Sequence, residues 1–311
     1  MKRIITVLLV FAFASTAYAS ATQKADEAFN SQDPSQRGFM AVPSPENDTE
    51  LQALIAENVN KFQVKTYSDD VSGLSIQYNI YFPEGYSPAK KYPAVVFIFD
   101  ARGAGQSPEY SLTNGYGALS WFDRDAVVIV PVYPGVVLDD HRGFILTDYV
   151  ELTGRFIRWA KEYYGLREIY GTGQSMGCMT TLVLASKYHD LYTACLFVSG
   201  QWDINTLEGL TGQKFIYVAS AGDTKASTGQ REVIDMFSAK GVQYVSYQNV
   251  NAKSPVVSPL PEQPVNFITF KKGTTLQDET QTQMQEHMTS FDYGYKIKAL
   301  RDWLFAQKEE E

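Results

Sequence analysis

Two patterns of apolar residues alternate along the chain: short continuous apolar runs, and apolar residues repeated at helical spacing. "YPAVVFIFD" and "AVVIVPVYP" are nearly continuous apolar runs, as in strands covered on both faces. "TDYVELTGRFIRWAKEYYG" repeats apolar residues at helical spacing and stops at Gly165. Strand-like "REIYGT", "ACLFVSG", "KFIYVASAGD" and "VQYVSYQNV" are then interspersed with helix-like "MGCMTTLVLASKYH" and "GQREVIDMFSAKG", and "RDWLFAQ" is predicted as the final helix. This order predicts an α/β fold with a mostly parallel central sheet and helices on both faces.

Two segments, residues 20–60 and 252–285, depart from this alternation of strands and helices. Residues 20–60 are polar and are expected to form a leader that wraps the domain, with one helix over residues 50–59. The domain is predicted over 61–311 and starts with a hairpin of "FQVKTYS" and "LSIQYNIYF". Residues 252–285 are rich in Pro and Gln and contain one strand candidate, "VNFITF". We interpret them as an insertion beside the active face.

The first nineteen residues predict export. A short basic start, the apolar run "IITVLLVFAF" and the small-residue pattern that ends at Ala19 are typical of a signal peptide cleaved after that residue. The run is too short to span a membrane. We therefore expect a soluble protein that is secreted or periplasmic, with no membrane insertion.

The net charge limits the classes of partner that the protein can bind, and the cysteines indicate its thiol chemistry. The net charge is −8 and no basic patch is visible, which argues against nucleic acid and anionic membrane surfaces as partners. Cys178 and Cys195 are the only cysteines. The predicted order of elements separates them, because Cys178 falls on a helix and Cys195 at the foot of the next strand. We expect two buried thiols, with a disulfide as the alternative.

"YGTGQSMGCMTTLVLAS" places Ser175 between a predicted strand and a predicted helix. A sharp bend there leaves the serine side chain exposed, and its neighbours two positions away must be small. Gly173 and Gly177 meet this requirement, as in a nucleophile elbow, with the N–H of Met176 at the start of the helix. The alternative is a glycine-rich turn with an idle serine.

A serine hydroxyl needs a base, and the chain has three histidines. His287 follows the serine in the order Ser, acid, His that this architecture uses. His141, in the loop after the fourth strand, and His189, where the elbow helix ends, are expected to be surface or capping residues.

The acid should end the strand two units after the serine. Asp223 stands there, directly after "KFIYVASAG". Asp203 ends the preceding strand and is the reserve candidate. Asp292 lies too close to His287 in sequence to be a suitable partner.

An oxyanion hole needs a second backbone donor from the loop "IFDARGAGQ" after the third strand. Position for position, Ala101 should supply it beside Met176, with Arg102 next in line. Ligands of parallel sheets bind outside the carboxyl ends of the strands. Residues that leave those ends, Tyr133, Gln201 and Trp202, are therefore expected to line the substrate pocket, and a core position is the alternative for Trp202.

The stretches "YPAVVFIFDARGAG", "YGTGQSMGCMTTLVLASKYHDLYTACLFVSGQWD" and "EHMTSFDYGYKIKALRDWLF" resemble secreted bacterial α/β-hydrolases. These are related to feruloyl esterases, polyhydroxybutyrate-depolymerase-like esterases and predicted peptidases of prolyl-oligopeptidase type. The resemblance covers about residues 74–307. It implies the α/β-hydrolase fold, with Ser175 as nucleophile, Asp223 as acid and His287 as base. Phe99 and Asp100 stand where related esterases carry His-Gly, so substrate specificity does not carry over.

We expect a serine carboxylic ester hydrolase that acts through an acyl-enzyme on a small-molecule or polysaccharide-linked ester. Only about forty residues separate Ala19 from the first sheet strand, too few for the large domain that restricts prolyl-oligopeptidase-type peptidases to short peptides. A peptidase of that type is the first alternative, and an inactive binding protein is the second. We expect no cofactor and no metal, because three scattered histidines offer no ligand cluster.

Overall fold

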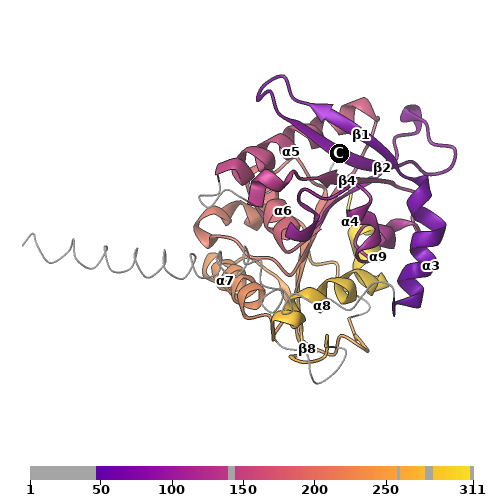
Figure 1. Cartoon of the computed structure of the whole chain (residues 1–311). Helices are drawn as coiled ribbons and strands as arrows, with labels where there is room; N and C mark the ends of the chain where they lie inside the picture. The colour runs from indigo at the N-terminus through magenta and orange to yellow at the C-terminus, as the bar shows by residue number, and fades with distance from the viewer. Residues whose placement is uncertain (1–46, 139–143, 258–259, 277–282, 309–311) are drawn as a thin grey trace, which may run out of the picture. The chain divides into compact units, whose positions relative to one another are not determined.

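The computed structural model describes residues 47–138, 144–257, 260–276 and 283–308, and all of them belong to one compact unit, residues 42–311. Predictions for the signal peptide, for most of the leader and for His141 concern residues outside these ranges. Labels follow Figure 1. The helices are α3 (Thr49–Asn58), α4 (Tyr110–Thr113), α5 (Phe144–Tyr163), α6 (Met176–Lys187), α7 (Thr224–Lys240), α8 (Gln283–Lys296) and α9 (Lys298–Ala306). The strands are β1 (Gln63–Ser68), β2 (Ser75–Tyr81), β3 (Ala94–Ile98), β4 (Val127–Val132), β5 (Ile169–Gln174), β6 (Ala194–Val198), β7 (Phe215–Ser220), β8 (Val245–Val250) and β9 (Val265–Phe270).

The described strands form a single sheet in the order β1-β2-β4-β3-β5-β6-β7-β9-β8. The hairpin strands β1 and β2 pair antiparallel, and β2 pairs antiparallel with β4. All other pairs are parallel. The predicted mostly parallel α/β sheet is therefore confirmed.

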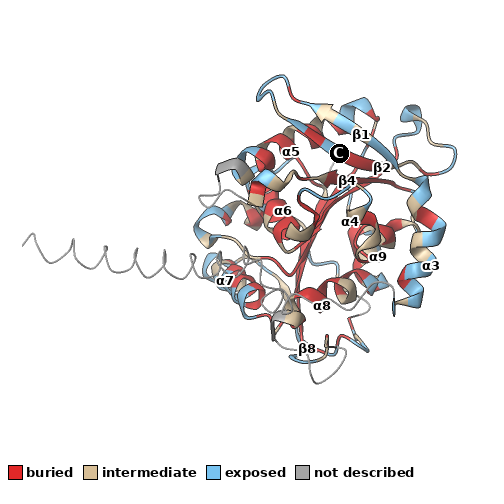
Figure 2. Ribbon diagram, viewed as in Figure 1, coloured by how far each residue is buried: buried red, intermediate tan, exposed pale blue. Residues whose placement is uncertain are grey.

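Helices cover both faces of the sheet, as Figure 1 shows. Along β3, Val96 and Ile98 belong to one buried cluster, and Val95 and Phe97 belong to the other. Helices α5 and α6 contribute to the first cluster, and α8 and α9 contribute to the second. Burying each such side chain stabilises the fold by roughly 1.5–3 kcal/mol, which explains why the central strands are apolar throughout. In Figure 2 these strands form the buried centre of the molecule.

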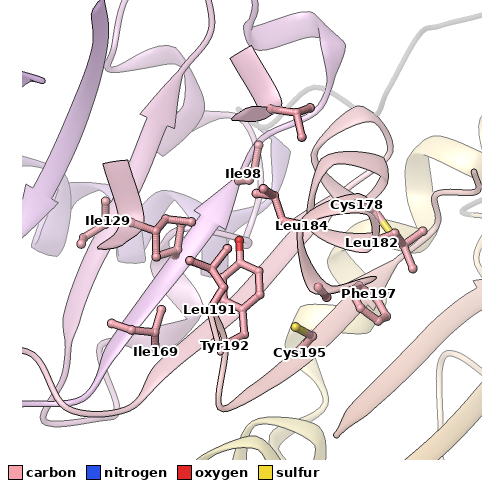
Figure 3. Packing of buried hydrophobic residues seen from close by; sticks show 14 of the residues in the cluster. Ile98, Ile129, Ile169, Cys178, Leu182, Leu184, Leu191, Tyr192, Cys195 and Phe197 are labelled. Carbon is pink, nitrogen blue, oxygen red and sulfur yellow. The ribbon is translucent and has the colours of Figure 1, made fainter. Parts of the chain in front are cut away.

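Both cysteines lie in the first cluster, as Figure 3 shows. Cys178 and Cys195 are free and fully buried, so the prediction of two buried thiols is confirmed. Burial raises the pKa of both thiols well above the ordinary value, because a thiolate would lose its hydration there. Neither sulfur is therefore suited to act as a nucleophile.

The interpretation of residues 252–285 as an insertion is wrong for one part of that segment. Val265–Phe270 is β9, a fully buried strand between β7 and β8. Because β8 and β9 are parallel neighbours, the chain must cross over between them, and the long polar connection makes that crossover.

Helix α8, which carries His287, is not among the elements that the hydrophobic pattern predicts. None of the described helices is long and apolar enough to cross a membrane.

Candidate active site

Ser175 occupies the sharp turn between β5 and α6, with φ of 51° and ψ of −118°. An added Cβ on Gly173 would lie 2.4 Å from the carbonyl of Gly177. A Cβ on Gly177 would lie 1.9 Å from the carbonyl oxygen of Ile98, at the end of β3. Both positions therefore require glycine, and the turn has the geometry that the sequence predicts for a nucleophile elbow.

Three side chains meet at this turn in one hydrogen-bonded array. The Oγ of Ser175 lies 3.0 Å from Nε2 of His287. The other ring nitrogen, Nδ1, lies 2.5 Å from Oδ2 of Asp223. The three residues come from the elbow, from the first part of α8 and from the loop after β7, and the array joins positions up to 112 residues apart.

The array is held from several sides. The second oxygen of Asp223 accepts a hydrogen bond from the N–H of Ala226 at 3.1 Å and caps α7, so only one oxygen is left for the imidazole. The ring of Phe291 meets the imidazole edge to face at 5.0 Å. The side chain of Asp223 is 5% exposed and that of His287 is 18% exposed. The carboxylate is thus shielded from water, while the imidazole and serine remain open to a ligand.

The other candidates lie elsewhere. His189 contacts Gln213 after the end of α6. Asp203 is exposed and caps the short turn that follows it. Asp292 accepts a hydrogen bond from the N–H of Tyr116 at 3.1 Å. None of these three side chains takes part in the array, and Asp203, the reserve candidate for the acid, is engaged in capping instead.

The loop after β3 lies beside the elbow, because β3 and β5 are neighbours in the sheet. Ala101 begins a short helical turn that Asp100 caps. The N–H of Arg102 donates to Oδ1 of Asp100 at 2.9 Å, so it is not free to bind an oxyanion. The N–H groups of Ala101 and Met176 thus remain the two candidate donors.

Asp100 ties this loop to the elbow, a role that the sequence analysis missed. Its buried carboxylate accepts from Nε and Nη2 of Arg102 at 2.9 and 2.7 Å. It also accepts from Nε2 of Gln174, the residue before Ser175, at 2.7 Å. The signal was the departure at Phe99 and Asp100 from the usual His-Gly. A buried carboxylate needs partners, and here the partners link the two donor segments.

Tyr133, which is expected to line the substrate pocket, is buried and lies with Met176 and Asp100 around a small hollow beside the elbow. Its hydroxyl lies 2.8 Å from Oγ1 of Thr153 inside the core, and burial raises the pKa of Tyr133 to about 12. The ring of Tyr133 also packs against that of Tyr149 in α5, with 6.0 Å between the ring centroids. Gln201 and Trp202 are partly exposed, and Trp202 also packs against the first core cluster.

Within the described ranges, no group of three or more His, Cys, Asp or Glu side chains could hold a metal ion. What the arrangement offers chemically is a hydroxyl, an imidazole and a buried carboxylate in one hydrogen-bonded array, with two candidate backbone donors in the adjoining segments. This is the set of groups that acyl transfer requires.

Comparison with known proteins gives the family. A family model described as the alpha/beta hydrolase fold matches residues 78–265. The chain belongs to the α/β-hydrolase fold family. No curated protein matches this hydrolase-fold chain in sequence.

Solved structures are similar to this α/β-hydrolase in fold. A thermostable esterase matches with a TM-score of 0.62 and 19% identity over 81% of the chain and 64% of the esterase. A dienelactone hydrolase from Anabaena variabilis matches with a TM-score of 0.52 and 12% identity, over 80% of the chain and 100% of that protein. Prolyl endopeptidases match with a TM-score of 0.51 and 10% identity, over 79% of the chain and 39% of theirs. The chain thus spans less than two thirds of the esterase and less than half of the peptidases.

Proposed function

We propose that this α/β-hydrolase is a serine esterase in which Ser175 is the nucleophile, His287 the general base and Asp223 the acid that orients the base. The observation that carries the proposal is the array itself, with Oγ 3.0 Å from Nε2 and Nδ1 2.5 Å from Oδ2. Hydrogen-bond reach between nucleophile and base, and between base and orienting acid, is the geometric requirement for this chemistry.

In the first step, Oγ of Ser175 attacks the ester carbonyl carbon while Nε2 of His287 takes the hydroxyl proton. The carbonyl oxygen becomes an oxyanion, which the N–H groups of Met176 and Ala101 receive. Asp223 stabilises the positive charge on the imidazole. The imidazole then gives its proton to the leaving alcohol oxygen, the C–O bond breaks and the acyl-enzyme remains.

In the second step, water replaces the alcohol. His287 removes a proton from the water as its oxygen attacks the acyl carbon, and the oxyanion forms again at the same two donors. The bond to Oγ breaks, the proton returns to Ser175 and the carboxylic acid leaves.

Esters suit this site better than amides. An alkoxide leaves more readily than an amine, which must first be protonated by the base. The similarity in fold to a thermostable esterase, with a TM-score of 0.62 against 0.51 for a prolyl endopeptidase, supports this choice.

The proposed pocket wall is formed by Gln201 and Trp202 beside the elbow. A Cβ on Gly200 would lie 2.8 Å from the carbonyl oxygen of Ser175, so the segment passes directly behind the serine. Both side chains are partly exposed, which leaves this wall accessible to small or polysaccharide-linked esters. Residues 1–19 fit an exported enzyme that meets such esters outside the cytoplasm.

The proposal is tested with Ser175→Ala and His287→Ala on p-nitrophenyl acetate and butyrate beside matched Xaa-Pro anilides. We expect the wild type to prefer the esters, and each variant to lose about 10⁴-fold or more in kcat because the residues act as a unit. His189→Ala, whose side chain contacts Gln213 instead, is the control and should retain activity.

Two results would contradict the proposal. Faster cleavage of the anilides would favour a peptidase. Failure of Ser175 to react with a fluorophosphonate probe, together with no turnover of any substrate, would favour a binding protein.

A further inference from the structure

A second carboxylate, Glu286, lies directly before His287 in sequence and is only 1% exposed. Its Oε2 accepts hydrogen bonds from the hydroxyl of Ser220 and from the N–H of Gly222, the latter at 3.0 Å. Its Oε1 accepts from the N–H of Gly273 at 2.6 Å. No Lys or Arg of the described ranges pairs with it. A buried carboxylate is costly without partners, so these three donors must compensate its lost hydration.

The donors come from the segments that hold the candidate acid. Ser220 ends β7, and Gly222 is the residue before Asp223. The bond from Gly222 to Glu286 therefore joins the two positions that immediately precede the acid and the base. Gly273 adds the turn after β9, so one side chain binds three segments together.

The two backbone donors are glycines, and each position has a structural reason for lacking a side chain. A Cβ on Gly222 would lie 2.1 Å from the carboxylate atoms of Glu286, so the carboxylate would have to leave its present position if residue 222 carried a side chain. Gly273 has φ of +82°, a left-handed conformation that favours glycine. The local sequence around the acid is therefore adapted to Glu286 as well as to Asp223.

We propose that Glu286 is a positioning residue that sets the distance between Asp223 and His287. The inference rests on the proposed function, in which that contact orients the base. Because the side chain fixes the backbone one residue before each partner, its loss lets the loop after β7 and the start of α8 move independently. The 2.5 Å contact between Nδ1 and Oδ2 then lengthens, and the imidazole loses its orientation toward Ser175.

The principal test is Glu286→Gln, which keeps the shape of the side chain but places an amide N–H₂ against a backbone N–H donor. We expect kcat for p-nitrophenyl butyrate to fall by about 10- to 100-fold, with KM within about twofold, because a small misplacement of a catalytic group is sufficient for such losses. Ser220→Ala removes one donor and leaves the other two, so it should fold even if Glu286→Gln does not. We expect it to lower kcat by about fivefold.

The matched control is Asp69→Asn in the turn between β1 and β2. Asp69 is also a buried carboxylate, and its Oδ2 accepts from the N–H of Ser72 at 2.8 Å and from Nε of Arg155 at 3.0 Å. It lies outside the proposed catalytic machinery. We expect Asp69→Asn to lower Tm while kcat is retained, which separates positioning from general loss of stability.

A readout independent of turnover is the NMR resonance of the Nδ1 proton shared by His287 and Asp223. We expect this far-downfield signal in the wild type and in Asp69→Asn, and its loss in Glu286→Gln and Asp223→Ala. Folded Glu286→Gln with wild-type kcat and an unchanged resonance would overturn the inference, as would losses no larger than those of Asp69→Asn at equal Tm. If the wild type hydrolyses no ester and Ser175 is not labelled, the proposed function fails, and the resonance alone still decides the role of Glu286.

Discussion

Ser175 shows how a single residue combines strain with chemistry. Its backbone φ of 51° is a conformation that residues with a Cβ rarely adopt, and it costs on the order of 1–3 kcal/mol. The surrounding glycines and the start of α6 hold the residue in this state, so the hydroxyl stands clear of the strand and faces His287. Strain at this position is part of the geometry on which the proposed nucleophile depends.

We predict that Ser175→Gly stabilises the protein although it removes the hydroxyl of the proposed nucleophile. Glycine adopts the positive φ freely, and this gain exceeds its larger loss of backbone entropy on folding. We expect the free energy of unfolding to rise by about 1 kcal/mol relative to Ser175→Ala, which keeps the Cβ and the strain. Urea denaturation measures both. Equal stabilities for the two variants would show that the turn is not strained.

At the scale of elements, the site depends on how closely β3, β5 and α6 approach one another. The start of α6 touches the end of β3 through Gly177, whose missing side chain leaves room for the carbonyl of Ile98. Asp100 then connects the loop after β3 to Gln174 at the end of β5. The two backbone donors proposed for the oxyanion are carried by these same segments, so packing and chemistry are linked here.

We predict that Gly177→Ala destabilises the protein far more than Gly241→Ala. The Cβ of the first variant would meet backbone at 1.9 Å, and backbone cannot yield without moving β3 or α6. We expect a loss of more than about 3 kcal/mol in the free energy of unfolding, or failure to fold. Gly241 ends α7 with φ of +69° and has open space around it, so its substitution should cost only about 1 kcal/mol. Losses of similar size in the two variants would refute the close-approach argument.

At the scale of the whole molecule, Asp292 connects the pH of the medium to the stability of the fold. Burial raises the pKa of Asp292 to about 6, although the charges of Lys296 and Arg102 and the N–H of Tyr116 oppose the shift. The negative charge of Asp48 adds to it. Because the pKa is raised on folding, the neutral form is favoured, and stability from this group is lost as pH rises through about 6.

We therefore predict that Asp292→Asn is more stable than the wild type at pH 8 but not at pH 4. The asparagine oxygen can still accept from the N–H of Tyr116, so only the charge changes. We expect a gain of about 1–2 kcal/mol at pH 8, discounted because the side chain is partly exposed. Chemical denaturation at both pH values measures it. Asp235→Asn, on an exposed part of α7, controls for the removal of one negative charge. A gain that does not change with pH would contradict the prediction.

The amino-acid sequence by itself determined the fold and the identity of the residues in the array. Continuous apolar runs predict strands covered on both faces, and the glycines around Ser175 predict a tight turn. The order of Ser175, Asp223 and His287 along the chain then selects His287, out of three histidines, as the proposed base. These signals depend only on residues close together in sequence or on the order of residues along the chain. They can therefore be recognised without knowing which segments are in contact in the folded protein.

Tertiary structure decided what depends on contacts between distant segments. Tyr133 leaves a strand end as expected, yet its ring packs inward against Thr153, because α5 lies over it. The strand Val265–Phe270 looked isolated between polar stretches, and only its pairing with β7 and β8 reveals its place in the sheet. Glu286 and Asp100 read as ordinary charged residues along the chain. Folding brings donors from three segments to the buried carboxylate of Glu286. It also places the carboxylate of Asp100 between its own loop and Gln174 at the end of β5.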